Sequence, residues 1–286
     1  MIKKQKIAVL MTCHNRKIKT LDCLNFFYKA NIPKNCEFVF FLVDDGSKDG
    51  TSIEVKKSFP LVKLIEGNGN LFWNQGMRLA WKTAIEFDEY NLFLLLNDDV
   101  ILDIDSLEVL FSTYQESLLK FNSETVVVSA CRNSENSDVF SYGGRDDNGV
   151  LKPNGTLQEC KYMNGNLVLI PRAVYSKIGG LSDKYTHGMG DYDYGLRVLE
   201  NKFKLITTKK YIATCPLNEG IPTWCNPSVS LILRWKSFNS PLGLNIREYK
   251  VFRKRFFSEN YCFSILKVYI KLLVPKLYLK LSNEKK

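Results

Sequence analysis

Short apolar runs alternate with longer mixed segments along the first half of the chain. Strand-sized runs occur at residues 6–13, 37–44, 62–66, 91–97 and 125–131. The segments predicted to be helical lie between them, at residues 17–30, 49–59, 74–87 and 103–119. Within the segment 37–44, residues 38–43 are all apolar, which is typical of a strand covered on both faces. This order predicts an α/β fold, an open and mostly parallel sheet with helices on both faces.

The pattern changes after residue 131. Asn, Ser, Gly and Asp dominate residues 132–160, which predicts a loop-and-hairpin excursion over the sheet edge. Strand character returns at 166–170, and helical character at 173–178 and 192–201. Residues 204–207 and 211–214 are expected to form a late pair of strands. We therefore expect one domain over 1–227, with halves at about 1–131 and 132–227.

The remaining segment, 228–286, is rich in Lys, Arg and aromatic residues and is expected to be a helical extension. Within 261–281 the lysines at 267, 271, 276 and 280 recur every four or five residues, which keeps them near one helical face. A basic, aromatic amphipathic helix can lie in a membrane interface. The alternative is a terminal helix that packs on its own domain with a solvated lysine face. Pro275 is expected to kink or divide it.

Composition narrows the class of protein. The chain has 286 residues, 45% of them hydrophobic, which supports a real core and excludes global disorder. Its net charge of +10 indicates a polyanionic partner. Nucleic acid, a nucleotide diphosphate and anionic lipid are all compatible with this charge. The apolar stretch at 7–11 is too short for a signal peptide or a membrane span, so we expect a cytoplasmic protein.

Carboxylates follow two of the predicted strands, and polar residues follow a third. Asp44 and Asp45 end the second strand, and Asp98 and Asp99 end the fourth, while the first ends in a polar segment at 12–16. Ligands bind outside the carboxyl ends of strands in an open parallel sheet. Clustered carboxylates repel one another, so this pattern favours a divalent cation, Mg²⁺ or Mn²⁺, or a basic ligand. A plain strand-to-loop turn is the alternative for the Asn-Asp sequence.

Four motifs together resemble the inverting family 2 glycosyltransferases, which have the GT-A fold, an open mixed sheet with helices on both faces. The motifs are VLMTCHNR at 9–16, VDDGSKDGT at 43–51, LLLNDDV at 94–100 and GDYDYGLR at 190–197. They occur in the family's order and span about residues 5 to 215. The resemblance implies that 1–131 is the nucleotide-binding half and 132–227 the acceptor-binding half.

The resemblance also implies roles for single residues on the donor side. Thr12 and His14 would flank the nucleobase, and Asp45 would accept a hydrogen bond from N3–H of uracil or thymine. Asp98 would contact the nucleotide and Asp99 would be the direct metal ligand. Arg16 and Asn70 complete the predicted nucleotide-binding set.

On the acceptor side, Asp191 falls where the family keeps its catalytic base. Asn164, His187 and Asp193 are expected nearby. A carboxylate at this position can also be a simple helix cap, and Asp193 fits that alternative equally well. Two positions depart from common family patterns, Asn97 and Gly190.

These features predict a metal-dependent enzyme that moves one sugar from a UDP- or dTDP-sugar to a hydroxyl of a saccharide acceptor. A lipid-linked acceptor in surface polysaccharide biosynthesis, membrane contact through the tail and no nucleic-acid partner are further expectations. A sugar-phosphate nucleotidyltransferase is a rival, but no glycine-rich loop follows the first strand. The positive charge also fits a basic module that binds nucleic acid or membrane, and the departures at Asn97 and Gly190 also fit an inactive relative.

Overall fold

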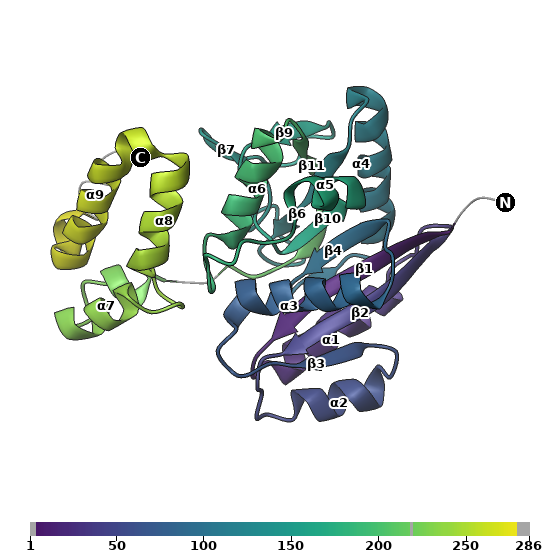
Figure 1. Cartoon of the computed structure of the whole chain (residues 1–286), viewed down its shortest axis with the longest axis horizontal. Helices are drawn as coiled ribbons and strands as arrows, with labels where there is room; N and C mark the ends of the chain where they lie inside the picture. Colours follow the sequence, from purple (N-terminus) through teal and green to yellow (C-terminus); the bar gives the residue numbers. More distant parts are fainter. Residues whose placement is uncertain (1–3, 218–219, 279–286) are drawn as a thin grey trace. The chain divides into compact units, whose positions relative to one another are not determined.

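The computed structural model describes residues 4–217 and 220–278, which fall into two compact units (Figure 1). The first unit runs up to Ser182 and resumes over Asp191–Leu217, and the second combines Asp183–Gly190 with residues 220–278. The predicted division at 227 falls inside the second unit. Trp224 and Cys225 explain this, because both belong to the small core of the second unit.

A mixed β-sheet forms the centre of the first unit. Its principal strands are β1 (Gln5–Cys13), β2 (Cys36–Asp44), β3 (Lys63–Glu66), β4 (Leu92–Leu96), β6 (Thr125–Arg132), β10 (Leu167–Pro171) and β11 (Lys204–Thr214). The order is β3-β2-β1-β4-β10-β6-β11-β5, with the short strand β5 (Ile101–Leu102) at one edge. Strands β1 to β4 are parallel, whereas β10 runs antiparallel to both β4 and β6. The expected open, mixed sheet is confirmed.

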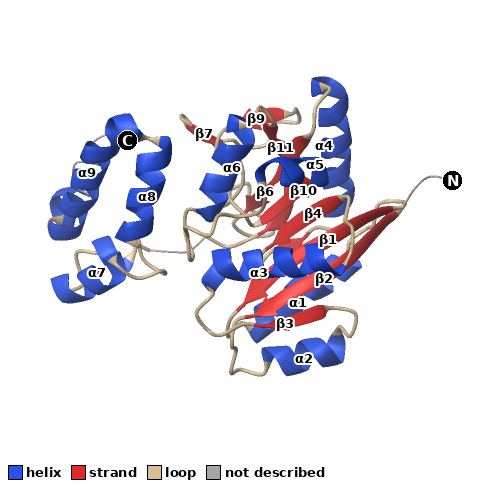
Figure 2. Cartoon of the chain, viewed as in Figure 1, coloured by secondary structure: helices blue, strands red, loops and turns tan. Residues whose placement is uncertain are grey.

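Helices cover both faces of this sheet, as Figure 2 shows. One face packs against α1 (Lys17–Lys29), α2 (Thr51–Ser58) and α4 (Ser106–Phe121). The other packs against α3 (Phe72–Phe87), α5 (Arg172–Ile178) and α6 (Gly190–Glu200). Neighbouring residues of one strand point to opposite layers, so Leu94 of β4 joins the first core and Leu95 the second. This explains why these strands are apolar throughout.

The last strand of the sheet differs from the expectation. The prediction of two strands at 204–207 and 211–214 is wrong, because β11 is one continuous strand whose register against β6 shifts between Thr207 and Tyr211. The Thr208 hydroxyl donates to the carbonyl of Lys210 and accepts from the amide of Ala130, which satisfies the backbone at the irregularity. Lys209 and Lys210 interrupt the apolar pattern at this point, which is why the sequence predicts two strands here.

The excursion at 132–160 contains the expected hairpin, formed by β7 (Arg145–Asp146) and β8 (Gly149–Val150). Its end was not expected, because β9 (Gln158–Cys160) pairs antiparallel with β11 and so belongs to the main sheet.

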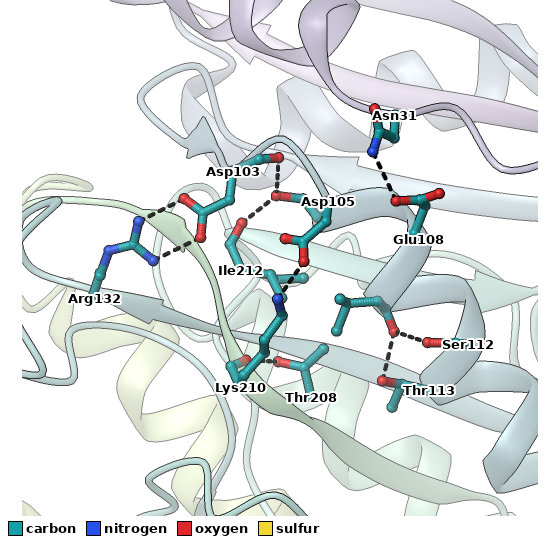
Figure 3. A network of polar contacts seen from close by, with 12 residues as sticks. Asn31, Asp103, Asp105, Glu108, Ser112, Thr113, Arg132, Thr208, Lys210 and Ile212 are labelled. Atoms are coloured by element: carbon teal, nitrogen blue, oxygen red, sulfur yellow. Dashed lines mark hydrogen bonds and ion pairs between the residues drawn. The ribbon is translucent and has the colours of Figure 1, made fainter.

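A polar network fixes the edge of the sheet around β5 and α4 (Figure 3). Arg132 makes two hydrogen bonds to the Asp103 carboxylate, of 2.7 and 2.6 Å. The amide of Asp103 donates to the carbonyl of Ile212, and the Lys210 ammonium pairs with Asp105. These contacts hold β11 beside the start of α4.

The second unit is helical. It contains η1 (Thr223–Cys225), α7 (Leu231–Phe238), α8 (Ile246–Phe256), η2 (Ser258–Asn260) and α9 (Tyr261–Leu273). The buried Arg234 donates to the carbonyl of Leu272, which ties α7 to the end of α9. The expected break at Pro275 is confirmed, since α9 ends at Leu273 and Pro275 starts a new helical turn. Lys280 and the end of the predicted helix lie outside the described residues.

Across the described segments, no helix combines the length and apolar character needed to span a bilayer.

Candidate active site

The carboxyl ends of β1, β2 and β4 meet at one rim of the first unit because these strands are parallel. Asp44 and Asp45 are both buried there. Asp44 accepts hydrogen bonds from the Ser47 amide, at 2.9 Å, and from the Ser52 hydroxyl. Asp44 therefore stabilises the turn that follows β2.

Asp45 organises the loop between β3 and α3. Its carboxylate accepts from the amides of Gly69 at 2.7 Å, Leu71 at 2.8 Å and Phe72 at 2.9 Å. A charge-assisted bond to a backbone N–H is stronger than a neutral one. A Cβ at Gly67 would lie 2.7 Å from a carboxylate oxygen of Asp45, so the loop passes too close for any other residue. Asn70 is exposed on this loop, where the sequence predicts it.

His14 and Thr12 lie at the end of β1 but face different surroundings. His14 is exposed, and its Nδ1 lies 2.5 Å from the carbonyl oxygen of Asp45, so this nitrogen donates. Its Nε2 lies 2.9 Å from the Asn15 side-chain nitrogen and accepts. Thr12 is buried, and a Cβ at Gly76 of α3 would overlap the Thr12 hydroxyl oxygen. Thr12 therefore marks a close strand–helix contact, whereas the His14 ring is open to a ligand.

Asp98 and Asp99 share one cation at the end of β4. Arg16 contacts an oxygen of Asp98 at 3.0 Å and an oxygen of Asp99 at 2.5 Å. The Asp98 side chain is only 5% exposed and that of Asp99 21% exposed. Burial raises the pKa of Asp98 to about 7, opposed by the charge of Arg16 and reinforced by that of Asp99. One guanidinium thus only partly compensates two adjacent carboxyl groups.

The oxygen ligands that Asp98 and Asp99 offer would bind a hard divalent cation only if a bound ligand supplied further oxygens. No group of three or more His, Cys, Asp or Glu side chains within the described ranges is arranged to hold a metal. Mg²⁺ is usually bound by one or two carboxylates, with waters and substrate phosphates completing its octahedron. Asp98 and Asp99 match that requirement, whereas the side-chain oxygen of Asn97 already accepts from the Trp73 indole at 2.7 Å.

Asp191 lies at the start of α6, and its carboxylate is partly buried. It accepts from the amide of Tyr192 at 2.9 Å and from that of Gly165 at 3.2 Å. Burial raises the pKa of Asp191, and hydrogen bonds from these amides and from the Asn164 side chain oppose the shift. The structure therefore brings Asn164 to Asp191, as the sequence predicts.

Trp73 joins the two halves of the site. Its indole N–H donates to Asn97, directly before Asp98, while its ring packs over Gly165, whose amide binds Asp191. A Cβ at Gly165 would lie 2.5 Å from the Trp73 ring. This contact was not predicted: Trp73 follows a glycine-containing loop, but nothing in the sequence identifies its partner.

The other two residues predicted on the acceptor side have different surroundings. Asp193 is fully buried and pairs with Arg197, one helical turn later, at 2.6 Å. Arg197 also donates to the carbonyls of Ile178 and Gly180, so the expectation of an acceptor contact at Asp193 is wrong and the pair is structural. His187 belongs to the second unit, where burial lowers its pKa and the charge of Glu248 opposes this.

Acidic strand ends over a mixed sheet, with a further carboxylate at a helix start, are the arrangement of an α/β protein whose ligand site lies at the carboxyl ends of its strands. The chain belongs to glycosyl transferase family 2, whose sequence model matches residues 8–172. It is therefore a glycosyltransferase that uses a nucleotide-sugar donor. None of the curated protein sequences matches this chain.

Solved structures of TarS from S. aureus have a similar fold. TarS 1-349 in complex with UDP aligns with a TM-score of 0.55 at 16% identity, covering 91% of this chain and 75% of that one. The complex of TarS 1-349 with UDP-GlcNAc aligns with a TM-score of 0.53 at 16% identity, covering 90% of this chain and 74% of that one. The structure of TarS aligns with a TM-score of 0.56 at 15% identity, covering 89% of this chain and 44% of that one. The central mixed sheet is thus GT-A-like, as expected.

We predict that Gly165→Ala impairs catalysis through Trp73 and Asp191. The new methyl group would overlap the indole ring, which Asn97 holds in place, and overpacking of this kind costs about 1–3 kcal/mol. Transfer rates should fall at least about tenfold, a change of about 1.4 kcal/mol in the barrier.

Gly180→Ala is the matched control, because its Cβ would meet only ordinary contacts, at 3.5 Å or more. Adding Trp73→Phe to Gly165→Ala removes part of the overlapping ring and should restore part of the rate. Equal rates for the two single variants, at equal thermal stability, would show that the Trp73 contact does not position Asp191.

Proposed function

We propose that this chain is an inverting glycosyltransferase that transfers one sugar from a UDP- or dTDP-sugar to a saccharide hydroxyl. The acceptor is lipid-linked, and the reaction belongs to surface polysaccharide biosynthesis at the cytoplasmic face of the membrane. One observation carries the proposal: Trp73 connects the Asp98–Asp99 rim to Asp191 through Asn97 and Gly165. A leaving-group site and a base are thereby held by one set of contacts.

His14 and Asp45 support recognition of a nucleobase. The His14 ring is exposed, and hydrogen bonds at both nitrogens fix its plane, which suits stacking. The Asp45 carboxylate has about four acceptor positions, and backbone amides occupy three. The remaining position accepts N3–H of uracil or thymine. TarS, which has a similar fold, has been solved with UDP and with UDP-GlcNAc.

Asp99, with Asp98 beside it, would hold Mg²⁺ or Mn²⁺ together with the donor diphosphate. Such a cation would stabilise the charge that develops on the leaving diphosphate. Arg16 contacts both carboxylates and so lies where it can also bind a phosphate oxygen.

Asp191 serves as the general base. It removes the proton from the acceptor hydroxyl as the hydroxyl oxygen attacks the anomeric carbon. The bond from that carbon to the diphosphate breaks in the same step, which inverts the configuration. Burial strengthens the base by raising its pKa, and the amides of Gly165 and Tyr192 hold the carboxylate in place.

Helix α9 supports attachment to a membrane surface. Phe263, Leu266, Ile270 and Leu273 are 68%, 58%, 41% and 54% exposed, and their spacing places them on one helical stripe. Lysines 267 and 271 border this stripe. An exposed apolar stripe with adjacent cations matches an anionic bilayer interface.

We predict selective binding of UDP or dTDP, and no comparable binding of GDP or CDP, in a thermal-shift panel with and without Mn²⁺. A ligand at a hundredfold excess over Kd stabilises the folded state by about 2.7 kcal/mol. Asp99→Ala should abolish the Mn²⁺-dependent part of the shift, while the exposed control Asp147→Ala retains it. If no nucleotide shifts the wild type, the chain is an inactive relative or a basic binding module.

We predict that Asp191→Asn lowers kcat about 10²- to 10⁴-fold with nucleotide binding unchanged, because only proton removal is lost. The base must be ionised, so the wild-type rate is full above the pKa of Asp191 and declines as the pH falls through it. Since that pKa is raised, the acidic limb should lie above the usual aspartate value of about 3.9. A rate that persists in Asp191→Asn would remove this residue from the reaction.

We predict that the full chain sediments with vesicles containing anionic lipid and that salt weakens this binding. The double variant Leu266→Ser, Ile270→Ser should bind at least about tenfold more weakly, because each buried apolar side chain contributes about 1.5–3 kcal/mol. Leu61→Ser with Leu119→Ser is the control, since these side chains are 82% and 86% exposed in the first unit. Equal loss in both double variants would exclude α9 as the attachment site.

A further inference from the structure

The second unit contains a surface hollow of about 790 Å³, lined by residues from the end of α7, the start of α8 and the loop between them. Seven residues line it: Trp235, Lys236, Asn239, Pro241, Asn245, Arg247 and Glu248. None of them belongs to the rim of the first unit. The residues that line the hollow are therefore different from those that we assign to the donor and the base.

The wall of this hollow depends on a tight loop between the two helices. A Cβ at Gly243 would overlap the carbonyl oxygen of Ser237, so only glycine lets the loop cross α7 there. Asn245, which precedes α8, has a φ of 46°, a left-handed conformation that is uncommon outside glycine. The hollow is thus held by specific backbone constraints, which are enriched around ligand sites.

An aromatic ring is presented on this wall. The Trp235 side chain is 49% exposed, and Phe238 packs against it with ring centroids 6.0 Å apart and planes inclined by 30°. Phe238 itself is fully buried. The indole therefore has a fixed orientation and exposed apolar surface, which suits contact with the C–H face of a sugar ring.

Two cations accompany this ring. Lys236 and Arg247 are both exposed, and neither forms an ion pair with a carboxylate in the described part of the chain. The one carboxylate on the wall, Glu248, accepts from the Thr186 hydroxyl at 2.6 Å. The hollow thus presents excess positive charge, and amide side chains from Asn239 and Asn245 add polar groups that can bind hydroxyls.

We propose that this hollow binds the acceptor through an anionic sugar unit, one that carries a carboxylate or a phosphate. Trp235 contacts the sugar ring, and Arg247 and Lys236 bind the acidic group. The proposal rests on the glycosyl transfer proposed above and specifies the class of its acceptor.

The same helix links this hollow to the segment that precedes the base. Glu248 binds Thr186, and Phe252 of α8 packs edge-on against Tyr185, with ring centroids 6.4 Å apart. Four residues of chain separate Thr186 from Asp191. A ligand in the hollow would thus contact α8, the helix that also holds the segment leading to Asp191.

Isothermal titration calorimetry on the full chain tests this proposal with four probes. They are tetragalacturonate, a phosphorylated tetrasaccharide, neutral maltotetraose and UDP. At least one acidic probe should bind about tenfold more tightly than maltotetraose. Trp235→Ala and Arg247→Ala should each weaken that binding at least about tenfold, while Lys254→Ala, which removes an exposed cation of α8 outside the hollow, should not.

Failure of both acidic probes to bind the wild type would overturn the proposal, as would equal weakening in Lys254→Ala and Arg247→Ala. UDP distinguishes this failure from failure of the proposed function. If UDP binds all variants equally while the acidic probes do not bind, the donor site stands and the acceptor assignment falls. If UDP does not bind either, the proposed function itself falls.

Discussion

The pairing of Arg16 with both Asp98 and Asp99 is the constraint on which the proposed donor side of the site depends. Two carboxyl groups leave the same strand end, one of them almost fully buried, and a single guanidinium serves both. Burial of an incompletely compensated charge is costly, which is why the pKa of Asp98 is raised. A strand end with this charge balance favours added positive charge, which the proposed divalent cation would supply together with the negative charge of a donor diphosphate.

The rest of the first unit keeps this rim in place. Parallel β1, β2 and β4 bring three strand ends together, and Asp45 gathers the amides of the loop before α3. That loop leads directly to Trp73, whose indole reaches Asn97 on one side and Gly165 on the other. The β3–α3 loop, the end of β4 and the start of α6 are therefore positioned by connected contacts. A disturbance at one of them is passed to the others through packing.

Much of this arrangement follows from the sequence, because hydrophobic period and strand-end polarity are local signals. The strand-end positions of Asp45, Asp98 and Asp99 were predictable in this way, whereas Asp191, at a helix start, was singled out only by the resemblance to the family. Long-range partners were not: no local pattern shows that Trp73 packs on Gly165, or that Asp45 uses most of its acceptor capacity on backbone amides. Asp193 differs in kind, since Arg197 stands four residues later on the same helix, and that spacing indicates an ion pair.

The two units of the chain do not follow the predicted boundary at 227, because each of them is built from two separate segments. Residues 183–190 belong with the C-terminal helices, although residue 191 belongs with the sheet. Tyr185 and Thr186 supply the reason, because their partners, Phe252 and Glu248, both lie on α8. Asp191, the proposed base, therefore stands at a covalent junction: the amides of Gly165 and Tyr192 orient its carboxylate, while residues 183–190, which precede it, belong to the second unit. The contacts of Tyr185 and Thr186 with α8 therefore give the C-terminal helices a structural part, because they hold the segment that directly precedes Asp191.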